Sequence, residues 1–183
     1  MASPYLAAIS QLVRNSPSTM ALSFEAPFDE AREFEPRGRG ESDVAPDASV
    51  VVNLKLESFS GGLRATGTVR APWFGVCRRC SKPIEGHLEA KVDERFVLER
   101  GPEDDLAYLY THDEVDLAPL VHDAILLELP LAPVCREDCQ GLCPYCGIDR
   151  NEATCDCRAP VDARWATLDG LRFADESDES NPE

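Results

Sequence analysis

Apolar and polar residues alternate along much of the chain after Val50, which is the pattern of strands that bury one face. The run VVNLKLES at 51–58 is followed by two glycines and then by LRATGTVR at 63–70. Two glycines between alternating runs predict a β-hairpin. Three further stretches have strand-like patterns: LSFEAPF at 22–28, IEGHLEAKVDERFVL at 84–98 (one or two strands) and YLYTHDEVDL at 108–117.

The periodicity changes to that of a helix in LAPLVHDAILLEL, residues 117–129. Asp116 can cap its first turn, and Pro130 ends it. The apolar face predicted for this helix is broad and comprises Leu117, Leu120, Val121, Ala124, Ile125 and Leu127. We therefore expect an α+β fold in which a small antiparallel β-layer is packed by this one main helix.

The composition restricts the class of partner. The chain has 183 residues and a formal net charge of −16, whereas non-specific binding of nucleic acid needs a broad basic face. The first twenty residues lack the basic start and apolar run of a signal peptide, and no segment has the length to span a membrane. The predicted helix carries no basic face for DNA. We expect a cytoplasmic protein that binds neither DNA nor membranes.

Cysteines supply the strongest chemical signal. The chain contains eight, in four close pairs: Cys77 with Cys80, Cys135 with Cys139, Cys143 with Cys146, and Cys155 with Cys157. Zinc prefers tetrahedral thiolate coordination, and two sulfurs a few residues apart form half a site. Eight thiols in a cytoplasmic chain therefore indicate two Zn²⁺ ions per chain rather than a disulfide framework.

The pairing of half-sites is less constrained. In Cys143-Pro-Tyr-Cys146, the following Gly147 allows the left-handed turn that points N–H groups at the sulfurs. Cys155 and Cys157 follow closely enough to complete that site locally. The favoured assignment therefore joins 77/80 to 135/139 and 143/146 to 155/157. Pairing 135/139 with 143/146 is an alternative.

These features divide the chain into four expected parts. Residues 1–21 would be a flexible N-terminal extension, and residues 22–134 the α+β core with the first zinc half-site. Residues 135–173 would form the cysteine-rich zinc-knuckle extension, ending in a short helix capped by Asp162 and bearing Trp165, Leu168 and Leu171. Residues 174–183 have the composition of a disordered acidic tail.

The sequence gives little support for a catalytic function. The letters CPYC also occur at the active site of glutaredoxins, where the motif lies between a strand and a helix. No such βαβ pattern surrounds it here. The three histidines (His87, His112 and His122) have no metal-ligand spacing, and His122 on the predicted helix is expected to be structural. All-sulfur zinc sites are closed, whereas catalytic zinc keeps an open position. The sequence predicts a protein that is not an enzyme.

One segment is basic. RAPWFGVCRRCSK at 70–82 contains no acidic residue, and it places aromatic side chains among cations. This combination is typical of an RNA contact, in which cations neutralise phosphates and aromatic rings stack on bases. Alternatively, the cations balance the zinc–thiolate charge and the rings pack in the core. The candidate RNA-binding residues are Arg70, Trp73, Arg78, Arg79 and Lys82.

Together, several segments resemble the YceD family, also described as large ribosomal RNA subunit accumulation proteins, in its actinobacterial form. They are CRRC after a hairpin, the helix VDLAPLVHDAILLELPLAPVC, REDCQGLCPYCG, CDC and the closing DARWATL. The resemblance covers residues 22–173. It implies a non-catalytic role in accumulation of large-subunit ribosomal RNA, and it implies that Cys77/Cys80 and Cys135/Cys139 belong together.

Two functional hypotheses follow. In the first, a zinc-stabilised protein supports biogenesis of the large ribosomal subunit by contacting its precursor, the precursor's rRNA or a basic ribosomal protein. An acidic chain suits a basic partner, because complementary charge raises the encounter rate. In the second, the zinc–thiolate sites sense oxidants or metal and regulate a partner.

Overall fold

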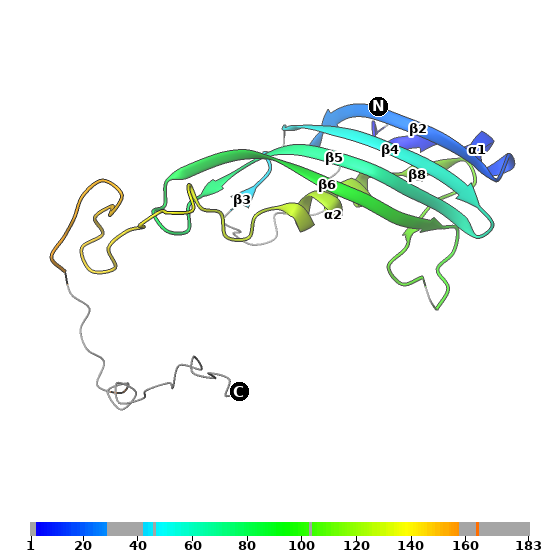
Figure 1. Ribbon diagram of the computed structural model, residues 1–183. Coiled ribbons are helices and arrows are strands. Elements are labelled where there is room, and N and C mark those ends of the chain that lie inside the picture. Colours follow the sequence, from blue (N-terminus) through cyan, green and yellow to red (C-terminus); the bar gives the residue numbers. More distant parts are fainter. Residues whose placement is uncertain (1–2, 29–41, 46, 103, 158–163, 165–183) are drawn as a thin grey trace, which may run out of the picture.

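The computed structural model describes residues 3–28, 42–45, 47–102, 104–157 and 164 (Figure 1). Its main feature is a long, curved sheet with a helix across one face. The elements in chain order are β1 (Leu6–Ala8), α1 (Ser10–Arg14), β2 (Ser18–Pro27), β3 (Ser42–Asp43), β4 (Ser49–Phe59), β5 (Gly62–Val76), β6 (Pro83–Val97), β7 (Tyr108–Leu109), β8 (Glu114–Asp116) and α2 (Ala118–Glu128).

The main sheet has the strand order β2-β4-β5-β6-β7, and β3 pairs with β5 beyond the end of β4. All its pairs are antiparallel except β6 with β7, which is parallel. A separate two-stranded sheet joins β1 to β8. The predicted hairpin is confirmed as β4 and β5, which turn at Gly61 and Gly62, and residues 84–98 form one strand rather than two.

Alternation along the strands separates a buried face from a polar one. In β4, Val50, Val52, Leu54 and Leu56 are almost fully buried, and the residues between them face outward. The outward face carries cross-strand ion pairs such as Arg64 with Asp93 at 2.7 Å. Because side chains alternate with a period of two, this register places the apolar set of every long strand on one side.

Helix α2 covers that apolar side, packing against β5 and β6 (Figure 1). The predicted start is confirmed: an Asp116 carboxylate oxygen accepts the Ala118 N–H at 2.9 Å. Leu117, Leu120, Val121 and Ile125 are buried, as expected. The prediction for Leu127 is wrong, because that side chain is 85% exposed on the side turned away from the sheet. The α+β class is confirmed.

The first twenty residues differ from the expected flexible extension. Tyr5, Ile9 and Leu12 belong to the core and are at most 5% exposed. The Leu12 carbonyl accepts hydrogen bonds from the Ser18 and Ser58 hydroxyls at 2.9 and 3.0 Å. Three apolar side chains of this short segment thus belong to the core, even though prolines and serines surround them.

Some expectations lie outside the described residues: the helix around Trp165, Leu168 and Leu171, and the acidic tail. The domain boundaries at 134 and 173 stay predictions. Within the described residues, no helix combines the length and the apolar character that a membrane crossing requires.

Candidate metal centres

The β5–β6 hairpin meets the segment that follows α2 at one end of the sheet (Figure 1), and the first cysteine tetrad joins these two parts of the chain. Cys77 and Cys80 occupy the tight turn between β5 and β6, in which the Cys77 N–H donates to the Lys82 carbonyl at 2.8 Å. The Arg78 N–H donates to the Pro133 carbonyl at 3.0 Å, which holds the incoming chain beside the turn. This places Cys135 and Cys139 opposite the first pair.

The spacing of these four sulfurs fits a tetrahedral metal. The Sγ atoms of Cys77 and Cys139 are 3.9 Å apart, and those of Cys80 and Cys135 are 3.7 Å apart. Four sulfurs at the Zn–S bond length on a tetrahedron are separated by roughly 3.8 Å. A disulfide would need about 2.05 Å, and all eight cysteines are free thiols. The donor set and geometry therefore suit Zn²⁺.

The second tetrad is built locally from Cys143, Cys146, Cys155 and Cys157, whose sulfurs lie within 4.8 Å of one another. Gly147 adopts φ +75°, as its position after Cys146 predicts, and its N–H donates to the Cys143 carbonyl at 2.9 Å. Only Cys143 is buried; Cys146 and Cys157 are exposed. The structure thus brings together the two groups that the sequence favoured, and the second is the more open.

Backbone N–H groups favour the ionised form of at least one sulfur in each tetrad. Burial acts to raise the pKa of the Cys77 thiol, but N–H groups including that of Cys135 outweigh it and bring the pKa to about 6. The N–H groups of Cys146 and Tyr145 lower the pKa of Cys143 to about 6. Since metal ligands must be thiolates, these donors prepare both sites for a cation.

The surroundings raise the pKa of other thiols. Desolvation of the Cys135 sulfur raises its pKa, although the residue as a whole is exposed, and hydrogen bonding to the Cys146 sulfur raises the pKa of Cys157. Four thiolates this close repel one another, so all four ionise together only around a cation. The tetrads therefore have the chemistry of metal sites.

The basic segment is largely occupied by internal contacts. Arg70 pairs with Glu89 across the outward face of the sheet, and Trp73 packs partly against the core. The Arg79 guanidinium donates to the carbonyls of Glu137 and Cys139 at 2.9 and 3.1 Å. Lys82 forms ion pairs with Asp149 at 2.9 Å and with Glu152 at 2.6 Å. These partners are carboxylates and carbonyls of the protein itself rather than the thiolates that the structural alternative named.

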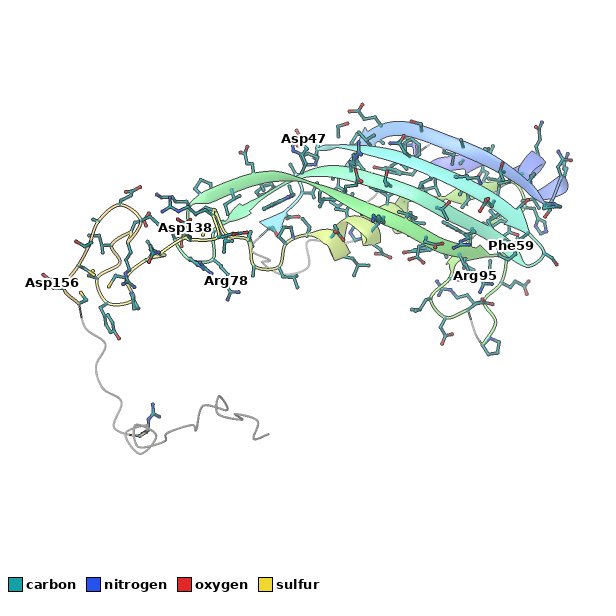
Figure 2. All side chains as sticks on the ribbon, viewed as in Figure 1. Asp47, Phe59, Arg78, Arg95, Asp138 and Asp156 are labelled. Atoms are coloured by element: carbon teal, nitrogen blue, oxygen red, sulfur yellow. The ribbon has the colours of Figure 1, made fainter. Side chains whose placement is uncertain are left out.

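Arg78 differs from the other four candidates. Figure 2 places it at the junction between the sheet and the cysteine-rich extension. It is exposed, and among the described residues its guanidinium has no ion-pair partner. Of the predicted RNA-binding set, Arg78 is thus the cation most available to an external ligand.

His122 has the structural surroundings that the sequence predicted. Its ring stacks on Phe28 with centroids 5.9 Å apart, and its Nδ1 lies 3.3 Å from an Asp123 carboxylate oxygen. It lies on α2, and neither tetrad includes a histidine.

Sequence reasoning missed the residues that join the two tetrads. Asn151 and Asp149 lie in the loop between Cys146 and Cys155, and the Asn151 side-chain amide donates to the Cys139 sulfur at 3.5 Å. Gly141 adopts φ +70° against the Arg79 carbonyl. Asp and Asn in a short loop commonly bond nearby backbone, but nothing in their spacing identifies a distant sulfur as partner.

The fold and the cysteine sites define an α+β protein with two all-sulfur tetrads that can hold metal ions. Residues 65–172 match the family described as large ribosomal RNA subunit accumulation protein YceD. The chain belongs to the YceD family.

Relatives support this membership. An uncharacterized protein of Mycobacterium tuberculosis is 38% identical over 122 residues, which are 64% of this chain and 59% of that protein. The Mycobacterium leprae relative is 31% identical over 133 residues, 70% of this chain and 61% of that protein. The chain therefore spans less than two thirds of these mycobacterial relatives.

A plant relative carries the family's descriptive name. The Arabidopsis thaliana protein named large ribosomal RNA subunit accumulation protein YCED homolog 1, chloroplastic, is 32% identical over 71 residues, which are 38% of this chain and 22% of that protein. No solved structure matches the chain.

Proposed function

We propose that this protein is a non-catalytic, zinc-binding factor of the cytoplasm that supports accumulation of large-subunit ribosomal RNA during biogenesis of the large ribosomal subunit. The observation that carries the proposal is the coincidence of two geometrically complete sulfur tetrads with membership of the YceD family. Zinc would stabilise the protein, and the folded protein would bind a component of the assembling subunit.

The ligand sets favour a structural metal over a catalytic one. Each tetrad offers four sulfur ligands, which complete the tetrahedral shell of zinc and leave no position for water or substrate. The first tetrad is also largely buried, since Cys77, Cys80 and Cys139 are at most 5% exposed. Zinc there would cross-link the hairpin to the segment after α2.

The charge distribution supports a basic ribosomal protein as the partner. Between Gly101 and Cys135 the chain has no lysine or arginine, although it contains Glu103, Asp104, Asp105, Asp113, Glu114, Asp116, Asp123 and Glu128. Exposed leucines accompany these acids, among them Leu127 on α2 and Leu131 just after it, which is 90% exposed. An acidic surface with apolar side chains complements a basic protein better than an RNA backbone.

Depletion of the protein in its host tests the function. We expect a selective loss of free and assembled large subunits on a sucrose gradient, with accumulation of precursor large-subunit RNA. A plasmid copy of the native chain or of Ser23→Ala, on the exposed face of the sheet, should restore the profile. Cys77→Ser should not. Normal subunit ratios after depletion would contradict the proposed role.

The exposure of Cys146 and Cys157 favours a second candidate function, a zinc–thiolate sensor of oxidants. Exposed thiolates oxidise more readily than buried ones. Release of zinc from the reduced protein by mild peroxide, followed with a colorimetric zinc indicator, would support this candidate. Retention of both ions under the same treatment would exclude it.

A further inference from the structure

The loop that closes the second tetrad also reaches the first. Asn151 lies between Cys146 and Cys155 in sequence, yet its side-chain Nδ2 donates to the Sγ of Cys139, a residue of the first tetrad, at 3.5 Å. An N–H donor stabilises a thiolate and orients it toward a metal, as polar groups around metal ligands generally do. One side chain of the second site thus acts on a ligand of the first.

Asn151 is held in place from both sides. Its side-chain oxygen accepts the Gln140 N–H and a guanidinium N–H of Arg136, both at 2.8 Å. Arg136 directly follows Cys135, and Gln140 directly follows Cys139. From its own loop, the Asn151 N–H donates to an Asp149 carboxylate oxygen at 2.9 Å. The amide is therefore locked between the segment that carries Cys135 and Cys139 and the loop of the second site.

Further contacts join the same two parts. Lys82, two residues after Cys80, binds Asp149 at 2.9 Å and Glu152 at 2.6 Å in the second loop. The Leu142 N–H donates to the Arg79 carbonyl at 2.8 Å, and the Arg150 N–H donates to the Gly141 carbonyl at 2.9 Å. The Asp149 carboxylate is only 15% exposed, so the junction excludes much of the solvent.

We propose that Asn151 couples the two tetrads, so that a metal ion in the second increases the affinity of the first. The inference rests on metal binding by both tetrads, as in the proposed function. A metal at Cys143, Cys146, Cys155 and Cys157 fixes both ends of the loop and presents the Asn151 amide to Cys139. Without it, the loop is free to move and Cys139 loses a donor. Coupling of this kind is reciprocal, so loading the first tetrad strengthens the second by the same factor.

Metal titration of the full chain tests this coupling. The native protein, Cys155→Ser, Asn151→Leu and the double variant are each titrated with Co²⁺ against a competing chelator, and sulfur-to-cobalt absorption reports loading. Because Cys155→Ser disables the second tetrad, its remaining affinity is that of the first. We expect the first tetrad to bind about 10- to 100-fold more weakly in Cys155→Ser than in the native chain. In a protein that already carries Asn151→Leu, adding Cys155→Ser should not weaken metal binding by the first tetrad any further.

Two more variants control the experiment. Asn53→Leu removes an amide on the outward face of the sheet, where its oxygen accepts a hydrogen bond from the Ser23 hydroxyl, and should leave both affinities unchanged. Asn151→Asp keeps the acceptor for Gln140 but replaces the donor to Cys139, so it should weaken the first site as Asn151→Leu does. The circular dichroism of the sheet verifies that each variant is folded.

The outcomes separate this inference from the proposed function. Equal affinity of the first tetrad in the native chain and in Cys155→Ser, or native affinity in Asn151→Asp, would overturn the coupling while leaving two metal sites. If the native chain binds no Co²⁺ at either tetrad, the coupling and the metal part of the proposed function both fail.

Discussion

Gly141 and Gly147 have similar left-handed backbones but different surroundings. Their φ angles are +70° and +75°. A Cβ added at Gly141 would lie 2.9 Å from the Arg79 carbonyl oxygen, whereas one at Gly147 would have nothing within 4 Å. Gly141 therefore allows the close approach of the two cysteine-rich segments, while Gly147 only completes its own turn.

This difference predicts the effects of alanine at each position. Gly147→Ala should cost about 1–2 kcal/mol, the ordinary penalty for a left-handed alanine. Gly141→Ala should cost more, because the backbone must also shift away from Arg79. The measurement is the free energy of unfolding of the zinc-loaded protein in guanidinium chloride. Equal losses in the two variants would contradict the contact between Gly141 and Arg79.

The sequence predicts residues well where their role depends on local pattern. Alternation identifies the buried residues of β4, and the position of Gly147 after Cys146 indicates its backbone conformation. Leu127 is different, because helical periodicity measures the width of an apolar face but not how much of it the sheet covers. Asn151 is different again. It lies in the loop of the second tetrad, but its partner sulfur belongs to the first tetrad, and only the folded structure brings the two together.

Among the elements, β1 and α1 contradict the expectation of a flexible N-terminus. The segment is too short for a clear helical period, and Tyr5, Ile9 and Leu12 lie among small and polar residues. Its structure depends on long-range contacts, such as the N–H of Ile9 donating to the Asp113 carbonyl at 2.8 Å. By contrast, β4, β5, β6 and α2 are long enough to be predicted from their own periodicity.

A pair of substitutions tests how firmly this N-terminal segment is packed. Ile9 is 1% exposed, whereas Leu6 in β1 is 42% exposed. Ile9→Ala should destabilise the protein by about 2–5 kcal/mol, because it leaves a cavity in the core. Leu6→Ala should change stability by only about 0.5 kcal/mol. Chemical denaturation provides both free energies of unfolding. An unchanged free energy of unfolding in Ile9→Ala would support the expectation that the N-terminal segment is flexible.

The two tetrads close loops of different length. Cys80 and Cys135 are 55 positions apart, and a cross-link over such a loop contributes about 4 kcal/mol in the chain-entropy description. The loop from Cys146 to Cys155 is much shorter and would contribute about 2.6 kcal/mol. The metal in the first tetrad should therefore be the more important for global stability.

Serine substitutions check this ranking. Cys77→Ser should lower the thermal midpoint of the whole domain, since it releases the hairpin from the segment after α2. Cys155→Ser should mainly increase amide hydrogen exchange between residues 140 and 157, with a smaller change in the midpoint. Equal global losses would refute the assignment of the two sites to different loops.

For the whole molecule, charge is the property that most affects binding. The formal net charge is −16, and two Zn²⁺ ions in four-thiolate sites would each leave a local charge of about −2. Metal binding therefore makes the protein more acidic. The fold could be predicted at the level of class and principal elements, but the identity of the partner depends on surfaces that no sequence period describes.

This charge predicts that binding to a basic ribosomal protein weakens as salt increases. Titrations by calorimetry between low and physiological ionic strength should show a steep loss of affinity, since the screening length falls from about 30 Å at 0.01 M salt to about 8 Å at physiological salt. Asp123→Asn combined with Glu128→Gln should weaken binding and reduce the salt dependence. Glu57→Gln combined with Glu89→Gln, on the outward face of the sheet, makes the same change in net charge and is the matched control. Affinity that does not change with salt would contradict an electrostatic complex.

The position of the first tetrad also determines how the chain would respond to mechanical force. With a metal ion in the first tetrad, a pull applied beyond Cys139 would pass through the sulfur–metal bonds to the β5–β6 turn and bypass everything between Cys80 and Cys135. This segment, whose two cysteines are 55 positions apart, includes all of β6 and all of α2, and it corresponds to about 190 Å of extended chain. An unfoldase that pulls on the C-terminal end would therefore stall at the metal-bound first tetrad. The shielded length would stay folded until a metal–sulfur bond broke.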